Sequence, residues 1–277
     1  MFECMMEGIF LKRLFETLRE ICSDISVECN GDGITMQAMD TSHISLIHLV
    51  IQPDFFQHYR CDSPCTLGLN IPFMLKVLAV VKERTTVYLS KGELDHDDPI
   101  LAIRIIESDL PNLALETENE SLEIQVKLID VEKERLEIPA CEYASKCTLN
   151  SKRFQEFAKY LNSIGDTVTV SMHKGTMTLE AEGEGVKVTK NFVSDVGEVR
   201  ITCGEPVSQI FATRYLVLFS KAALLAQEVS IMLSPGIPLS VKFHFCDKAR
   251  YTSTDGSSHP VGGTAFINFY LAPNIEE

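Results

Sequence analysis

Alternating apolar and polar residues recur along the chain and predict a protein rich in β-strands. Every second residue is apolar in the clearest segments, which are 122–127, 167–172, 177–182, 229–233 and 241–245. A period of two over short segments is typical of antiparallel sheets with one buried face. Helices are expected at 11–20, 72–82, 151–160 and 214–225. Together these elements predict an α+β fold.

The two halves of the 277-residue chain resemble each other. LKRLFETLRE at 11–20 aligns with SKRFQEFAKY at 151–160, an offset of 140 (151 − 11). Four charged positions agree, which are the pairs Lys12 and Lys152, Arg13 and Arg153, Glu16 and Glu156, and Arg19 and Lys159. In each half, the predicted order of elements is strand, helix, strand, turn, strand. The spacing is about half the chain, so it indicates a duplicated domain rather than a short solenoid repeat.

The positions of the basic residues are more informative about nucleic-acid binding than the net charge of the chain. A formal net charge of −14 argues against general nucleic-acid binding. However, basic residues lie on the expected outer helix faces, at Lys12, Arg19, Lys76, Lys152, Lys159 and Lys221. At 100° per residue, Lys12 and Arg19 fall within about 20° of each other, with Leu14 and Leu18 opposite. A solvated helix surface and a surface for a polyanion both explain this pattern.

Composition excludes several classes of protein. Nine cysteines, an odd number, indicate reduced thiols in the nucleus or cytosol. We interpret Cys61 and Cys65 as ordinary, partly buried thiols, because no second pair stands at zinc-ligand spacing. No run of 18 apolar residues predicts a membrane span, and the N-terminus does not resemble a signal peptide. We find no catalytic constellation and expect no enzyme activity, cofactor or metal.

Several segments resemble the eukaryotic sliding clamp family, proliferating cell nuclear antigen. They are MQAMDTSHISL at 36–46, YRCD at 59–62, LEIPACEY at 136–143, RYLVLFSKA at 214–222, IPLSVKF at 237–243 and YLAPNIE at 270–276. The resemblance implies a DNA-clamp fold with two similar domains, each with two helices packed on antiparallel sheets. Subunits of this family join head to tail into a closed trimeric ring around duplex DNA. The implied domains are 1–127 and 144–277, joined by a connector at 128–143.

The resemblance also implies a DNA-binding channel. Residues that match the family's basic positions are Lys12, Arg13, Arg19, Lys76, Lys159 and Lys221, and the internal repeat adds Lys152 and Arg153. Ala79, Glu156 and Ser163 depart from the family's basic pattern. Binding to duplex DNA is expected to be independent of sequence, because the contacts would be to phosphates.

A pocket for partner peptides is implied as well. In the family, the connector supplies one wall, matched by Leu136, Ile138 and Pro139, and partners insert a glutamine, an aliphatic residue and two aromatic residues. The remaining matched positions are Met39, His43, Ile44, Leu46, Pro238, Tyr270, Ala272, Pro273 and Ile275. A simpler interpretation is that Leu136 and Ile138 only fix the connector to its own domain.

Further matches concern assembly and modification. The segments 119–127 and 185–190 match the strands that pair between subunits, with Leu122, Ile124, Val126, Val186 and Val188 as interface residues. Lys174 matches a lysine that accepts ubiquitin-like modifiers. A Ser-, Gly- and Thr-rich insertion at about 250–266 is longer than the family's usual turn and is best interpreted as a flexible surface loop.

The expected function is a nuclear DNA sliding clamp that acts as a processivity factor and docking platform. Expected partners are double-stranded DNA, further copies of the chain in a homotrimer, a replicative DNA polymerase, a clamp loader, a flap endonuclease and a DNA ligase, with no membrane. One alternative is a subunit of a heterotrimeric checkpoint clamp. Others are a nucleic-acid-modifying enzyme with an unfamiliar site, and a scaffold that binds only proteins.

Overall fold

The computed structural model forms two compact units, each with its own core. It describes residues 1–92, 99–107, 121–131, 142–196, 198–245 and 265–274. The first unit contains the described residues of Met1–Ala38, Leu49–Arg135 and Cys246–Ala265, and the second those of Met39–His48, Leu136–Phe245 and Phe266–Glu277. The domain boundaries expected from the sequence, near residues 127 and 143, stay a prediction.

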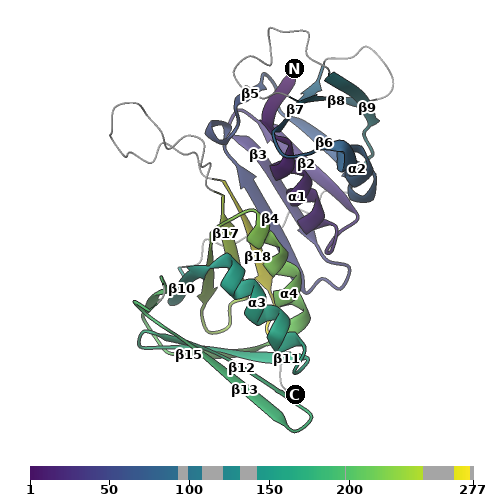
Figure 1. Cartoon of the computed structure of the whole chain (residues 1–277). Coiled ribbons are helices and arrows are strands. Elements are labelled where there is room, and N and C mark those ends of the chain that lie inside the picture. The colour runs from purple at the N-terminus through teal and green to yellow at the C-terminus, as the bar shows by residue number, and fades with distance from the viewer. Residues whose placement is uncertain (93–98, 108–120, 132–141, 197, 246–264, 275–277) are drawn as a thin grey trace. The chain divides into compact units, whose positions relative to one another are not determined.

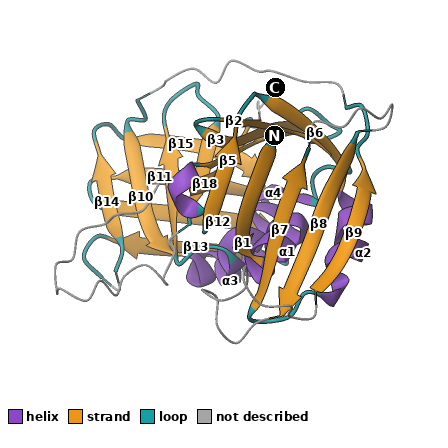
Figure 2. Ribbon diagram, turned by 90° about the horizontal axis from the view of Figure 1, so that it is seen from above, coloured by secondary structure: helices purple, strands orange, loops and turns teal. Residues whose placement is uncertain are grey.

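The first unit consists of α1, α2 and antiparallel strands. Its elements are β1 (Phe2–Glu7), α1 (Gly8–Leu18), β2 (Asp24–Asn30), β3 (Gly33–Met39), η1 (Pro53–Phe55), β5 (His58–Cys61), β6 (Cys65–Asn70), α2 (Ile71–Val77), η2 (Leu78–Val80), β7 (Thr85–Lys91), β8 (Ile100–Glu107) and β9 (Ser121–Lys127). One sheet has the order β5-β1-β7-β8-β9, and its strands β1, β7, β8 and β9 run side by side in Figure 2. A second group has β2 between β3 and β6. Strand β4 (Ser45–Ile51) has residues in both units.

The second unit repeats this arrangement. Its elements are β10 (Ser145–Asn150), α3 (Ser151–Asn162), β11 (Thr167–His173), β12 (Thr176–Gly183), β13 (Val186–Val193), β14 (Arg200–Cys203), β15 (Val207–Ala212), α4 (Thr213–Ser220), η3 (Lys221–Leu224), β16 (Glu228–Leu233), β17 (Leu239–His244) and β18 (Ala265–Leu271). One sheet has the order β13-β12-β11-β15, and β14, β10, β16, β17 and β18 pair in succession. Helices α3 and α4 lie side by side (Figure 1), and the side-chain amide of Gln155 donates to the Ser220 carbonyl at 2.9 Å.

The duplication is confirmed, but the offset read from the charged residues is wrong by three. Helix α1 begins at Gly8 and α3 at Ser151, an offset of 143 (151 − 8). The strand registers agree, because Val27 pairs with Met36 in the first unit and Val170 pairs with Leu179 in the second. A shift of three residues is almost one helical turn, so both alignments keep the same helix face outward. The charge matches at the offset of 140 are lost at 143, where Lys12 aligns with Gln155 and Arg19 with Asn162.

Capping side chains and buried faces explain where the helices form. The Asn70 side chain accepts a hydrogen bond from the Phe73 amide at the start of α2, and Asn150 accepts from the amides of Lys152 and Arg153 at the start of α3. Each second helix is shorter than the sequence predicted and continues as a 3₁₀ turn, η2 or η3. Opposite the exposed faces, buried apolar residues include Leu14, Leu18, Ile21, Phe154, Ala158 and Leu161, as the helical periodicity predicted.

Aromatic side chains fill both cores. In the first unit, Phe56 stacks on Tyr59 with ring centroids 5.0 Å apart. In the second, Phe219 of α4 stacks on Phe269 of β18 at 4.7 Å, and Phe243 meets the same ring edge-on. These contacts fix α4 against the sheet of its unit. Replacing a buried phenylalanine by alanine typically lowers the free energy of unfolding by about 3–5 kcal/mol.

Close backbone packing requires a glycine at position 68 of β6. A Cβ atom added to Gly68 would overlap the carbonyl oxygen of Ile129, whose own amide donates to the Gly68 carbonyl at 3.0 Å. This contact holds the described start of the connector against β6. Connector residues 132–141 and insertion residues 250–264 lie outside the described residues. Strand β18 begins at Ala265, so the last two residues of the predicted insertion, 265 and 266, belong to a strand.

We expect Gly68→Ala to lower the free energy of unfolding by about 1–3 kcal/mol, because the methyl group must displace backbone atoms. Urea unfolding of the full chain measures the effect. Gly31→Ala is the matched control, because a Cβ atom at Gly31 would have nothing within 4 Å. Equal unfolding midpoints for the two variants would contradict the prediction.

Candidate nucleic-acid and peptide interfaces

The predicted basic residues of the first unit have different surroundings. Lys76 is exposed on α2, and Arg19 is exposed at the end of α1, where its Nε lies 3.2 Å from the Glu20 carboxylate. Arg13 is half-buried on α1. Lys12 has a structural partner, because its Nζ donates to the carbonyls of Ala79 at 3.3 Å and Val81 at 3.2 Å. Arg19 and Lys76 therefore present the more accessible positive charge.

The position of Lys12 has an uncharged counterpart in the second unit. At the offset of 143, Lys12 corresponds to Gln155, whose side chain reaches the Ser220 carbonyl. Both side chains donate to carbonyl oxygens at the end of the second helix of their unit, where helical carbonyls lack intrahelical partners. A hydrogen-bond donor at this position is enough to satisfy these carbonyl oxygens, and a positive charge is not required.

In the second unit, Lys152 and Lys159 are exposed on the outer face of α3. The Arg153 guanidinium lies 5.3 Å from the centre of the Phe192 ring, a distance typical of cation–π contacts. Lys221 is half-buried at the start of η3. Arg214 is exposed on α4 but was not predicted as a site residue, although it begins the RYLVLFSKA segment on which the family resemblance was based.

A buried carboxylate organises the loop from residue 40 to residue 45 in the second unit. The Asp40 side chain accepts hydrogen bonds from the amides of Ser42, Ile44 and Ser45 and from the hydroxyls of Ser45 and Tyr215, at 2.7–3.2 Å. His43 within this loop has a φ of 53°, in the left-handed region. The family resemblance predicted a pocket that includes Met39, His43, Ile44 and Leu46, but it did not predict the carboxylate that holds their loop.

Other predicted pocket residues lie close to the same loop. The Ala272 amide donates to the Ile44 carbonyl at 3.1 Å, and the Ile44 side chain is 38% exposed. Tyr270 pairs with Ser240, two residues beyond Pro238. Tyr143 donates to the Pro238 carbonyl at 3.0 Å, and Pro273 follows Ala272. The remaining predicted residues, Leu136, Ile138, Pro139 and Ile275, lie outside the described part of the chain.

The hydrogen bonds also set the protonation of Asp40. Burial alone would raise the pKa of this carboxyl group, but the donors from Ser45, Tyr215, Ile44 and Ser42 outweigh burial and lower the pKa below its ordinary value. The charged form is therefore the one that the folded protein stabilises. The contribution is complete above the ordinary pKa of about 4 and is lost as the pH falls through the lower pKa of the folded state.

The expected interface strands stand at the ends of their sheets. Within the described residues, β9 pairs only with β8, and β13 pairs only with β12. Leu122 is 46% exposed on β9 and Val186 is 48% exposed on β13, while Ile124 and Val188 are half-buried. Val126 is 3% exposed and lies in the core of its own unit. An apolar row beside unpaired backbone groups favours pairing with another chain.

Lys174, the predicted modification site, is exposed at the turn between β11 and β12. Its φ of 31° reflects this turn, in which Gly175 also has a positive φ. The side chain therefore lies on a short connection between two strands of the second unit, where an attached group would not displace core residues.

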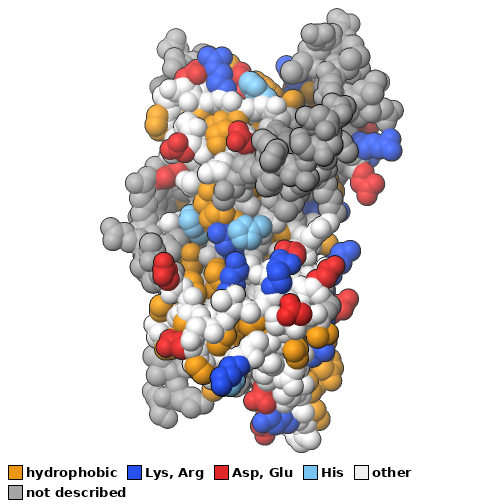
Figure 3. Space-filling view, turned by 90° about the vertical axis from the view of Figure 1, so that its left-hand side faces the viewer, with side chains coloured by type: hydrophobic (Ala, Val, Ile, Leu, Met, Phe, Trp, Pro, Cys, Tyr) orange, Lys and Arg blue, Asp and Glu red, His pale blue; other side chains and the backbone are white. Residues whose placement is uncertain are grey.

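Figure 3 shows histidine side chains beside lysine or arginine side chains in the middle of one face. In the second unit, Lys242 Nζ lies 3.6 Å from the centre of the Phe266 ring, and His48 and His244 pack on the same ring. Burial, together with nearby lysine charge, lowers the pKa of both histidines and of Lys242. The histidines are therefore mostly neutral at pH 7, and the cluster carries less positive charge than its composition suggests.

The described residues contain no group of three or more His, Cys, Asp or Glu side chains arranged to hold a metal ion. Among the helices that the structure describes, none is long and apolar enough to cross a membrane.

Two units, each with paired helices against antiparallel sheets, define the DNA-clamp class of fold. Two models of a known protein family match most of the chain. The model for the N-terminal domain of proliferating cell nuclear antigen matches residues 1–135, and the model for the C-terminal domain matches residues 137–252. The chain belongs to the proliferating cell nuclear antigen family.

Two relatives illustrate the similarity. The chain is 52% identical over 275 residues to proliferating cell nuclear antigen 2 of Plasmodium falciparum, covering 99% of both chains. It is 30% identical over 275 residues to proliferating cell nuclear antigen of Chaetomium thermophilum, covering 97% of this chain and 96% of the relative. The predicted family is thereby confirmed, and as a member the chain is a DNA sliding clamp and processivity factor.

We expect Asp40→Asn to lower the free energy of unfolding by about 2–3 kcal/mol at pH 7, because hydrogen bonds to a charged acceptor are lost. The difference from the wild-type protein should narrow as the pH falls below about 4, where the wild-type carboxylate also becomes protonated. Thermal unfolding between pH 7 and pH 3 measures both effects. Asp32→Asn, in the exposed turn between β2 and β3, is the control and should change little. A loss independent of pH would contradict this account.

Proposed function

We propose that the chain forms a homotrimeric ring that encircles duplex DNA and holds replication and repair proteins on it. The observation that supports this most is the exposure of basic residues on helices of both units, within a chain of net charge −14. The family membership supports the same function. The protein acts in the nucleus as a scaffold without enzyme activity of its own.

The DNA contacts are to phosphates and independent of base sequence. Arg19, Lys76, Lys152 and Lys159 are the main contributors, because their side chains are exposed on helices. Arg13, Arg153 and Lys221 add charge from half-buried positions, and Lys12 contributes in addition to its hydrogen bonds. Such contacts weaken with salt and permit sliding, since the closed ring rather than high affinity retains the DNA.

Partner proteins dock by a short peptide on the surface around the Asp40-organised loop. Ile44, Pro238 and Ala272 are exposed there. The connector residues Leu136 and Ile138, which match the wall of the family's pocket, lie outside the described residues. Burial of each apolar anchor contributes about 1.5–3 kcal/mol. Two or three anchors, after the cost of ordering the peptide, give roughly micromolar affinity, which suits partners that exchange. The partners are a replicative DNA polymerase, a clamp loader, a flap endonuclease and a DNA ligase.

The ring closes through β9 of one copy and β13 of the next. Pairing satisfies the unpaired backbone groups of both edges and covers Leu122 and Val186. A contact of this kind joins two different surfaces and closes when the rotation between copies divides a full turn. The second candidate function is that of a subunit in a heterotrimeric clamp. In that case, these edge strands would pair with two different chains rather than with copies of this chain.

We expect the double variant Arg19→Glu with Lys159→Glu to lose most of the stimulation of DNA synthesis. Reversal of charge replaces phosphate attraction by repulsion at both helices, and each lost contact should reduce the salt dependence of binding by about 0.9 in log–log slope. Primer extension by a replicative polymerase with loaded clamp, measured over a range of salt concentrations, gives the effect.

Lys146→Glu is the matched control for this experiment, because Lys146 is an exposed lysine of the second unit that lies on strand β10. The native mass of every variant is measured alongside. Full stimulation by the double variant, with its oligomeric state unchanged, would show that these helices do not face DNA.

We expect the wild-type protein to have a native mass of about three times 31.0 kDa at low micromolar concentration. Leu122→Asp or Val186→Asp should shift the mass toward the single chain, because each places a charge in the apolar contact between edges. Light scattering measures the mass. Val196→Asp, at a valine that is 60% exposed in a turn, is the control. A wild-type chain that remains monomeric would favour the heterotrimeric candidate.

A further inference from the structure

Cysteine thiols form a cluster in the first unit that the sliding-clamp function does not explain. Cys29 of β2 stands directly opposite Cys65 of β6 in the antiparallel register. Cys61 ends β5, and Cys65 begins β6 after a short loop. The Cys65 thiol interacts by hydrogen bonds with both Cys29 and Cys61, and Cys4 of β1 lies near Cys29. All of these cysteines are free thiols.

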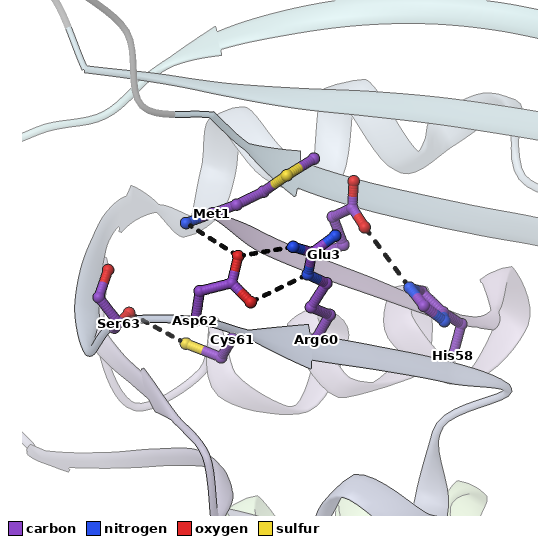
Figure 4. A network of polar contacts seen from close by, with 7 residues as sticks. All are labelled: Met1, Glu3, His58, Arg60, Cys61, Asp62 and Ser63. Atoms are coloured by element: carbon purple, nitrogen blue, oxygen red, sulfur yellow. Dashed lines mark hydrogen bonds and ion pairs between the residues drawn. The ribbon is translucent and has the colours of Figure 1, made fainter.

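The loop between Cys61 and Cys65 is held by polar contacts (Figure 4). The Arg60 Nε lies 2.9 Å from the Asp62 carboxylate, and the N-terminal amine of Met1 lies 3.8 Å from it. The Cys61 thiol donates to the Ser63 carbonyl at 3.2 Å. These contacts keep Cys61 at the end of β5 and leave a positive N-terminus near the thiols.

The surroundings distinguish Cys65 from its neighbours. Cys4 and Cys29 are buried, whereas Cys61 and Cys65 are half-buried. The hydrogen bond from Cys29 and the charges of Lys91 and the N-terminus together lower the pKa of Cys65 to about 6, against the effect of burial. The pKa of Cys29 is raised by its hydrogen bond to Cys65 and by burial. Partly exposed thiols near positive charge are the ones that react as thiolates.

We propose that Cys65 is a site of oxidation by hydroperoxides and that Cys29 is the partner thiol with which it forms a disulfide. Residues directly opposite each other in an antiparallel pair have Cα atoms about 4.5–5.5 Å apart, which lies within the range of disulfides. The ladder therefore holds the two Cα atoms at a separation that a disulfide can span, and oxidation needs no change in strand order.

The reaction balances with hydrogen peroxide as the oxidant. The Cys65 thiolate attacks one peroxide oxygen, so that an S–O bond forms, the O–O bond breaks, and the departing hydroxide takes up a proton to become water. The Cys29 thiol then loses its proton, and its sulfur attacks the Cys65 sulfur. The S–S bond forms, the S–O bond breaks, and a second water leaves. Two thiols are oxidised by two electrons, and the peroxide is reduced.

The first test is the alkylation rate of each cysteine at pH 6 in the full-length reduced protein. At this pH, a thiol of pKa about 6 is half ionised, against about 0.3% for an ordinary thiol of pKa 8.5, while its lower basicity reduces nucleophilicity roughly 13-fold. Cys65 should therefore react about tenfold faster than an ordinary thiol. Cys203 is the comparison, because it is half-buried and hydrogen bonds to carbonyl oxygens. Equal rates would overturn the proposal.

The second test maps the oxidised product by mass spectrometry after treatment with one equivalent of hydrogen peroxide. The wild-type chain should give the Cys29–Cys65 disulfide, and Cys61→Ser should still give it. The double variant Cys29→Ser with Cys61→Ser, which keeps a hydroxyl donor at position 29 and leaves no neighbouring thiol from β2 or β5, should accumulate a sulfenic acid on Cys65 that a dimedone probe traps. Cys65→Ser should give neither product. A disulfide between Cys61 and Cys65, or oxidation of Cys203 at the same rate, would overturn the assignment. Native mass and polymerase stimulation of the reduced protein should be unchanged in Cys65→Ser.

Discussion

The buried carboxylate of Asp40 is the interaction on which the proposed peptide-docking surface of the second unit depends. It accepts hydrogen bonds from three backbone amides of its own loop and from the hydroxyl of Tyr215 in α4. One charged group therefore fixes the loop that carries Ile44 and ties that loop to a helix with the exposed basic residue Arg214. Burial of a charge is unfavourable unless its hydrogen bonds are satisfied, so this arrangement tolerates little change.

Much of the fold was predictable because the sequence repeats simple patterns. Alternation marked the strands, and the buried positions Phe154, Ala158 and Leu161 followed from helical periodicity. The offset between the halves was not predicted correctly, because the charge matches at 140 lie almost one helical turn from the structural offset and put the same helix face outward. Only the strand registers fixed it at 143, and they showed that Lys12 corresponds to Gln155 rather than to Lys152.

The candidate sites were harder to predict from the sequence than the fold. Residues that match a family motif, such as His43 and Ile44, could be named, but Asp40 within that motif gave no sign of its hydrogen bonds. Cys61 and Cys65 were interpreted as ordinary thiols. The residue that most lowers the pKa of the Cys65 thiol is Cys29, which lies on another strand. Pairing between strands brings such residues together, and spacing along the chain does not reveal it.

The positions of β9 and β13 at the ends of different sheets, in different units, give any ring built from them a direction. When one strand of a copy pairs with the other strand of the next, every copy must point the same way around the ring. The two faces of such a ring are unlike, and no rotation exchanges them. A protein docked on one face would always lie on the same side of the ring, so the way in which the ring is loaded would decide the direction in which that protein faces along the double helix.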